Sequence, residues 1–277
     1  MSESTLAPTR FRATIQYDGT GFHGSQLQPR VRTVQGEIET ALGRLLDGPT
    51  RIDLAGRTDT GVHALAQEIA FEAPARWSAE DLGRGLSALL PSDVALELPR
   101  EAAPDFHPRF AARRRRYEYM IAMLDMARSP FVRTYAWRLD AGTRMSEEDL
   151  DGLDDLAALI VGERSFRSFA RSGQPERGAR CLVESARWTC YPGGWLSFRI
   201  TADRFLHHMV RYLVGTMVEV ATRRRPAADV GALLAGEPAT RAVFPAPPHG
   251  LYLTGVEYED GWNRPAGVPW LGGGSAE

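Results

Sequence analysis

The sequence of 277 residues contains no lysine, so all 33 of its basic residues are arginines. Their charge is nearly balanced by 35 acidic residues, and the formal net charge is −2 at pH 7. A chain without lysine cannot form a Schiff base or use a lysine nucleophile. Because the chain as a whole is not basic, any nucleic-acid site must be a local patch of arginines.

Cysteine and long apolar runs are also scarce. Cys181 and Cys190 lie nine residues apart without a Cys-x-x-Cys pair, which excludes a zinc site or a disulfide framework and predicts two buried, reduced thiols. No apolar run approaches 18 residues, and residues 1–10 lack the apolar stretch of a signal peptide. We therefore expect a cytoplasmic protein with no membrane partner.

The distribution of apolar residues is typical of a mixed α+β protein. Residues 11–17 and 117–123 alternate as half-buried strands do, whereas residues 34–46 and 82–90 carry the apolar stripe of amphipathic helices. Strands and helices are mixed in both halves without strict βαβ alternation. This pattern predicts two α/β halves with mainly antiparallel sheets.

A shift in charge marks the middle of the chain. Residues 107–138 hold eight arginines and two acidic residues, whereas residues 139–163 hold one arginine and eight acidic residues. We expect a flexible N-terminus over 1–10, an N-terminal half over 11–138, a C-terminal half over 139–262 and a mobile tail over 263–277. In the C-terminal half, Ser146 begins a capping box, and residues 205–221 are apolar enough for a buried helix.

Asp59 is the sharpest catalytic candidate, because it lies in a glycine-flanked loop that follows a predicted strand. Arg57 would keep its carboxylate ionised, and His63 lies just beyond the turn. An ionised carboxylate can act as a nucleophile or general base. The alternative is an aspartate that only shapes the turn.

Asp59-Thr60-Gly61 also spells the aspartic-protease signature. Such a protease needs two aspartates that share a proton, and the chain contains no second Asp-Thr-Gly or Asp-Ser-Gly. The adjacent Arg57 opposes a shared proton. The sequence therefore argues against a protease.

Four successive arginines, 113–116, precede Tyr117, with His107 and Arg109 nearby. Arginine beside an aromatic ring suits a site that holds phosphate while a base stacks. The alternative is a charged edge strand, since residues of a strand point to both faces.

His207 and His208 lie in the apolar segment that precedes Arg211. Adjacent histidines on a helix diverge by about 100°, so they do not form a paired metal site, and we predict no metal. Arg211 needs an anionic partner in apolar surroundings, either Asp59 or another acidic residue.

From about residue 11 to residue 258 the sequence resembles the tRNA pseudouridine synthases of the A type. Residues 54–64, Leu-Ala-Gly-Arg-Thr-Asp-Thr-Gly-Val-His-Ala, look like the active-site loop of that family. Further matches follow in order at residues 17–20, 33–36, 89–91, 106–110, 116–119, 205–211 and 250–253. The sequence departs from the family pattern at Ser25, Thr60, Ser87 and Pro245, where tryptophan, alanine, asparagine and threonine are usual.

The resemblance implies that Asp59 is the catalytic aspartate and that Tyr117 stacks on the target uracil. It also implies that Arg57 helps to extrude the nucleotide and that Arg211 pairs with the aspartate. We assign further RNA contacts to His107, Arg109, Arg116 and Arg171. The family fold has two α/β halves around a central antiparallel sheet with an RNA-binding cleft, and acts as a homodimer on the anticodon arm of tRNA.

The implied reaction is an isomerisation, which needs no cofactor or metal. Asp59 would attack the ribose or the uracil, or remove a ribose proton to give a glycal, and the sequence leaves these routes open. Two other functions stay open as well: an RNA-binding protein with an inactive site, and a glycosidase-like hydrolase that releases free uracil.

Overall fold

The computed structural model describes residues 7–139, 145–171 and 178–264. The chain divides into two compact units, which are described separately. Unit 1 comprises Met1–Arg113 and Leu253–Ala266, and unit 2 comprises Arg114–Tyr252 and Gly267–Glu277. The boundary predicted from the sequence at residue 138 stays a prediction.

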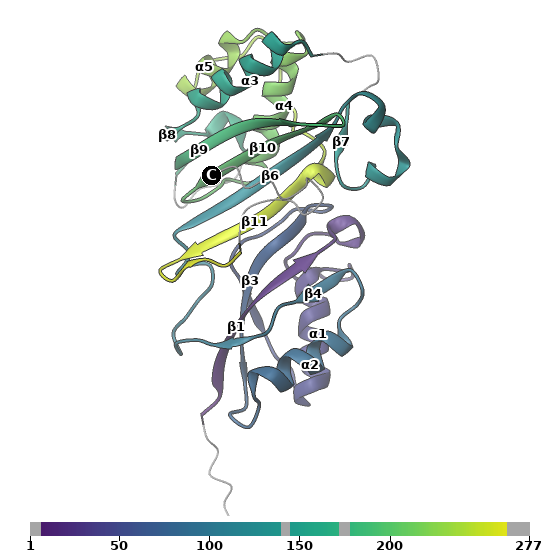
Figure 1. The fold of residues 1–277 in the computed structure, drawn as a ribbon. Helices are drawn as coiled ribbons and strands as arrows, with labels where there is room; N and C mark the ends of the chain where they lie inside the picture. The colour runs from purple at the N-terminus through teal and green to yellow at the C-terminus, as the bar shows by residue number, and fades with distance from the viewer. Residues whose placement is uncertain (1–6, 140–144, 172–177, 265–277) are drawn as a thin grey trace, which may run out of the picture. The chain divides into compact units, whose positions relative to one another are not determined.

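Unit 1 is an antiparallel sheet with two helices (Figure 1). Strand β1 pairs with β3, β4 and β5, and the short β2 pairs with β3. Strand β11 follows β3 in the strand order and pairs with β12. The strands are β1 Thr9–Tyr17, β2 Ile52–Leu54, β3 His63–Ala73, β4 Val94–Leu96, β5 Arg100–Glu101, β11 Leu251–Tyr258 and β12 Gly261–Trp262.

The helices of unit 1 begin where the sequence supplies N-caps. In α1 (Val34–Leu46) the hydroxyl of Thr33 accepts the N–H of Gly36, and in α2 (Ala79–Leu89) Ser78 accepts the N–H of Asp81. A short 3-10 helix, η1, spans Gly19–Gly21. All but one of the residues of β3 are buried, so this strand forms the centre of the unit.

Unit 2 contains the strands β6, β10, β9 and β8, which are neighbours in this order. All these pairs are antiparallel, whereas the short β7 pairs with β6 in parallel. The strands are β6 Arg114–Ala122, β7 Trp137–Arg138, β8 Gly162–Ser165, β9 Arg180–Tyr191 and β10 Trp195–Ala202. The helices α3 Glu147–Leu159, α4 Met209–Ala221 and α5 Ala228–Ala235 gather beside β9 and β10 (Figure 1).

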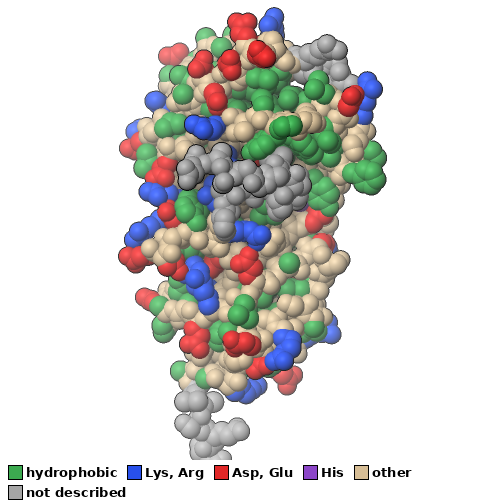
Figure 2. Space-filling view, viewed as in Figure 1, with side chains coloured by type: hydrophobic (Ala, Val, Ile, Leu, Met, Phe, Trp, Pro, Cys, Tyr) green, Lys and Arg blue, Asp and Glu red, His purple; other side chains and the backbone are tan. Residues whose placement is uncertain are grey.

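Four 3-10 helices complete unit 2: η2 Leu124–Arg128, η3 Pro130–Val132, η4 Arg167–Phe169 and η5 Pro248–Gly250. Figure 2 shows acidic side chains gathered over α3, as the charge shift in the sequence predicts. The N-terminus of α3 carries the predicted capping box, in which Ser146 and Asp149 bond each other's backbone N–H groups.

The structure confirms an α+β fold with mainly antiparallel sheets, and it corrects two details. The helix predicted from Phe205 begins only at Met209, because His208 adopts a left-handed conformation with φ of 65° that ends the preceding turn. Cys190 is exposed, not buried as predicted, whereas Cys181 is buried. None of the described helices has the length and apolar character needed to cross a membrane. Residues 265–277 of the tail predicted over 263–277 lie outside the described residues.

Candidate active site

Asp59 lies in a tight turn of unit 1 between β2 and β3. The N–H of Val62 donates to the carbonyl of Asp59 at 3.1 Å, which closes the turn over Thr60 and Gly61. Gly61 has φ of 78°, a left-handed conformation that glycine adopts without strain. The side chain of Asp59 is half-buried, and that of Arg57 is exposed. The structure therefore presents a carboxylate at the start of a fixed turn, two residues from a cation.

The segment after β1 packs directly on this loop. A Cβ atom on Gly19 would lie 2.1 Å from the carbonyl oxygen of Val62, so only glycine fits there. The N–H of Gly19 donates to Nδ1 of the buried His63 at 3.0 Å. His63 thus holds the turn against the N-terminal segment. The segments 17–20 and 54–64 therefore pack against each other.

A second group of predicted residues in unit 1 surrounds an exposed aromatic ring. The ring of His107 lies 4.3 Å from that of Phe110, and Nδ1 of His107 accepts the N–H of Arg109 at 3.1 Å. The guanidinium of Arg109 lies 6.0 Å from the centre of the Phe110 ring. Phe110 is 65% exposed. Sequence reasoning did not single it out, although it follows two of the residues predicted to contact RNA.

Tyr117 lies on β6 of unit 2, opposite Ile200 of β10. Its ring meets the ring of Phe205 edge to face, with centroids 4.9 Å apart and an interplanar angle of 82°. Only 9% of the Tyr117 residue is exposed. The phenylalanine thus fixes the plane of the tyrosine ring.

Some members of the arginine run are engaged within their own units. Arg113 pairs with Glu259 at 3.2 Å in unit 1. In unit 2, Arg114 pairs with Glu184 at 2.5 Å, and Arg115 donates to the carbonyl of Asp203 at 3.1 Å. The neighbouring Arg116 is buried. Arginines of this run therefore form ion pairs and hydrogen bonds within the protein, in addition to making this segment positively charged.

Arg211 lies in the first turn of α4 in unit 2. Its Nε donates to the carbonyl of Ala246 at 2.8 Å, and its own carbonyl accepts the N–H of Ala246 at 2.9 Å. Burial raises the pKa of the nearby Tyr119 well above its ordinary value, and the positive charge of Arg211 opposes that shift. Asp59 belongs to unit 1, so the predicted contacts of its carboxylate with Arg211 and Tyr117 stay predictions.

Arg171 is exposed and follows η4, and its N–H donates to the carbonyl of His207 at 3.1 Å. The rings of His207 and His208 lie 4.1 Å apart. Their different backbone conformations, with His208 left-handed, replace the helical arrangement that the sequence predicts for this pair.

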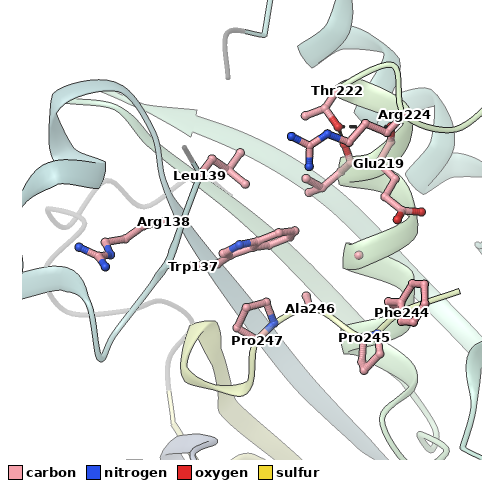
Figure 3. Close-up of a pocket in the computed structure, with 12 residues that line it drawn as sticks. Trp137, Arg138, Leu139, Glu219, Thr222, Arg224, Phe244, Pro245, Ala246 and Pro247 are labelled. Carbon is pink, nitrogen blue, oxygen red and sulfur yellow. Dashed lines mark hydrogen bonds between the residues drawn. The ribbon is translucent and has the colours of Figure 1, made fainter. Parts of the chain in front are cut away.

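Unit 2 also contains a pocket of about 220 Å³ that sequence reasoning did not anticipate (Figure 3). Trp137 points into it from β7, and the segment Phe244–Pro247 forms a wall beside α4. A Cβ atom on Gly215 would lie 2.4 Å from the carbonyl oxygen of Phe244, so this wall lies close against the helix. The same segment contains the carbonyl that receives Arg211, and the pocket therefore borders one of the predicted site residues.

Comparisons with known proteins place this chain in a class of RNA-modifying enzymes. A family model described as tRNA pseudouridine synthase matches residues 13–111 and 156–259. A tRNA pseudouridine synthase A from Pseudothermotoga lettingae is 36% identical over 249 residues, covering 90% of this chain and 99% of the relative. The Solidesulfovibrio magneticus protein of the same name is 40% identical over 271 residues, covering 97% of each chain.

A solved archaeal box H/ACA sRNP Nop10-Cbf5 complex aligns with a TM-score of 0.35 and 11% identity, covering 75% of this chain and 43% of that chain. That likeness is too weak to carry an argument. The matches in sequence define the class as pseudouridine synthases, which are isomerases. The chain belongs to the tRNA pseudouridine synthase family.

Proposed function

We propose that this isomerase converts uridine to pseudouridine in the anticodon stem-loop of tRNA, with Asp59 as the catalytic residue. The observation that carries the proposal is the half-buried carboxylate of Asp59 at the start of a hydrogen-bonded turn, with Arg57 two residues away. The names of the relatives support tRNA as the substrate. The resemblance of the sequence supports the anticodon stem-loop as the position, and the cytoplasm stays the predicted location.

The reaction moves a bond without changing the composition of the nucleotide. The glycosidic bond from N1 of uracil to the ribose breaks, the base turns, and C5 bonds to the same ribose carbon. C5 loses its proton and N1 gains one, so no donor or acceptor group is consumed. An ionised Asp59 supplies either a nucleophile for a covalent intermediate or a base for the glycal route.

A stacked uridine must leave its neighbours before a carboxylate can reach it, at a cost of a few kcal/mol. Tyr117 is proposed to replace the lost stacking with its own ring, whose plane Phe205 fixes. Arg57 is proposed to assist extrusion, and Arg211 to pair with the carboxylate. His107, Arg109, Arg116 and Arg171 are proposed to hold phosphates, and the exposed Phe110 beside Arg109 supports that assignment.

The enzyme is further proposed to act as a homodimer, as the resemblance implies. Exposed apolar side chains in unit 2 support a contact with a second copy, since Leu124 is 57% and Phe131 is 86% exposed. Figure 2 shows hydrophobic side chains gathered at the right-hand margin, over the segment that carries η2 and η3 in Figure 1.

The substitution Asp59→Asn tests the proposal, because it keeps the shape of the side chain and removes the charge. We expect pseudouridine formation to fall below detection in nuclease-digested tRNA, while binding of tRNA persists. The control is Asp47→Asn, an exposed C-cap of α1 with φ of 57°, a conformation that asparagine tolerates. It should leave turnover unchanged.

Retained turnover in Asp59→Asn would remove Asp59 from its catalytic role. Free uracil released from tRNA by the unaltered enzyme would instead favour a glycosidase-like hydrolase. Binding of tRNA without any change of the uridines would favour an RNA-binding protein with an inactive site.

A further inference from the structure

The loop that carries Asp59 is held by polar side chains that the proposed chemistry does not use. Backbone pairing of β2 with β3 ends where the N–H of Ala55 donates to the carbonyl of Glu68 at 2.9 Å. At the next residue the side chain of Gln67 takes over: its Oε1 accepts the N–H of Gly56 at 3.1 Å, and its Nε2 donates to the carbonyl of Gly56 at 2.8 Å. Gln67 is fully buried. Its amide thus extends the strand pairing into the loop.

Ser25 holds the loop at Thr58, the residue directly before Asp59. Its N–H donates to the carbonyl of Thr58 at 3.1 Å, and its Oγ accepts the N–H of Thr58 at 2.9 Å. The carbonyl of Ser25 accepts the N–H of Gln35 at 2.9 Å, which ties the contact to the start of α1. Ser25 is fully buried, and Gly24 has φ of 91°, which brings the chain within reach of the loop.

Tyr17 closes the cluster at the end of β1. Its hydroxyl and Oγ1 of Thr58 lie 2.7 Å apart, in hydrogen-bond contact. Burial raises the pKa of Tyr17 to about 12, and the hydrogen-bonding side chains of Thr58, Gln67 and Ser25 oppose that rise. The hydroxyl therefore keeps its proton at neutral pH and stays available as a donor.

We propose that Tyr17, Ser25 and Gln67 are positioning residues, a loop latch that fixes the backbone of residues 56–58 and thereby aims the carboxylate of Asp59. The proposal rests on the proposed function of Asp59. The latch holds the chain on the N-terminal side of Asp59. The hydrogen bond from the N–H of Val62 to the carbonyl of Asp59 holds it on the C-terminal side. A catalytic group must be held within about 0.5 Å of its productive position, which needs locked neighbours of this kind.

Ser25 is one of the positions at which the sequence departs from the family pattern. The resemblance noted in the sequence implies a tryptophan there, and an indole N–H can only donate a hydrogen bond. It could not accept the N–H of Thr58, whereas Oγ of Ser25 does. Serine therefore contributes a contact to the loop backbone that the usual residue cannot make.

The substitution Ser25→Ala tests the latch against a matched control, Ser78→Ala. Both remove a serine hydroxyl of unit 1 that accepts a backbone N–H, at 2.9 Å from Thr58 and at 3.1 Å from Asp81 respectively. Both should lower stability, but Ser78 caps α2 and makes its hydrogen bonds with Asp81, not with the loop. We expect kcat for pseudouridine formation to fall about tenfold in Ser25→Ala with KM for tRNA within about twofold, because a misaimed carboxylate slows chemistry and not binding.

The control should keep kcat within about twofold, measured well below the melting temperature of each variant. If Ser25→Ala does not fold, Tyr17→Phe removes only one hydroxyl and should show the same loss of kcat at constant KM. Equal kcat in the latch variant and Ser78→Ala would overturn the latch. An unaltered enzyme that forms no pseudouridine in tRNA would instead overturn the proposed function, so the two failures are distinguishable.

Discussion

Arg12 illustrates how a single residue can organise the interior of unit 1. Its guanidinium lies between the rings of Phe106 and Tyr258, 4.5 and 4.4 Å from their centres, and its Nε donates to Glu68 at 2.6 Å. Glu68 is fully buried and also accepts a hydrogen bond from Thr14 at 2.9 Å. The arginine therefore joins β1, β3 and β11 through one charge and two aromatic faces.

Removal of Arg12 should leave the buried carboxylate of Glu68 without its main partner. We predict that Arg12→Met lowers the free energy of unfolding by about 3–5 kcal/mol, measured by urea denaturation, because an unpaired buried charge is costly. Adding Glu68→Gln should recover part of the loss, since the charge is then gone. The control Arg84→Met removes an exposed arginine that pairs with Asp81 and should change stability by less than about 1 kcal/mol. Strictly additive losses in the double variant would contradict this coupling.

Among single residues, the sequence indicated the charged residues of the site better than the residues that hold the loop in place. Asp59 and Arg57 stand out because glycine and turn-forming residues surround them within one short stretch. Gln67 and Ser25 do not, since each acts on a loop residue 11 or 33 positions away through a side-chain hydrogen bond. A local signal was the pair of adjacent polar residues, Gln67 and Glu68, between apolar residues of strand β3.

Among the helices, α3 is stabilised by a capping box at its first turn. The hydroxyl of Ser146 accepts the N–H of Asp149 at 3.1 Å, and the carboxylate of Asp149 accepts the N–H of Ser146 at 2.9 Å. The backbone and side-chain hydrogen bonds from Ser146 lower the pKa of Asp149 below its ordinary value. A lowered pKa means that the folded state favours the ionised form.

We predict that Ser146→Ala lowers the free energy of unfolding by about 1 kcal/mol at pH 7. The contribution of Asp149 should be fully present above the pKa of an unfolded aspartate, about 3.9, and should disappear as pH falls through its lower folded value. Urea denaturation of the unaltered protein and of Asp149→Asn between pH 7 and pH 3 would measure it. The two should differ at pH 7 and converge toward pH 3, and a constant difference would contradict the assignment.

The elements themselves follow the sequence closely where local rules are strong. The predicted strand over residues 11–17 lies within β1, and the predicted helices over residues 34–46 and 82–90 correspond to α1 and α2. The predicted start of α4 was wrong because Phe205 and Leu206 are as apolar as the helix that follows, while the backbone turns at His208 before the helix begins. Apolar periodicity reports burial, and it cannot distinguish a buried turn from a buried helix.

For the whole molecule, the net charge of −2 hides a strong segregation of charge along the chain. Six acidic residues lie within α3 alone, whereas arginines dominate residues 107–138. Several of those arginines are already paired, as Arg113 is with Glu259 and Arg114 with Glu184. The number of arginines that contact phosphate should therefore be well below the number in the sequence.

Salt dependence of tRNA binding can count those contacts. Three arginines are proposed to hold phosphates, namely Arg109, Arg116 and Arg171, and each phosphate contact contributes roughly −0.7 to −0.9 to the slope of log affinity against log salt. We predict a slope of about −2.4, and hence a loss of affinity of roughly 30-fold between 50 and 200 mM salt. The variant Arg109→Gln should reduce the magnitude of the slope by about one, whereas Arg84→Gln, an exposed arginine of α2, should leave it unchanged. A slope near zero for the unaltered enzyme would mean that these arginines do not bind the tRNA backbone, because released counterions are the source of the effect.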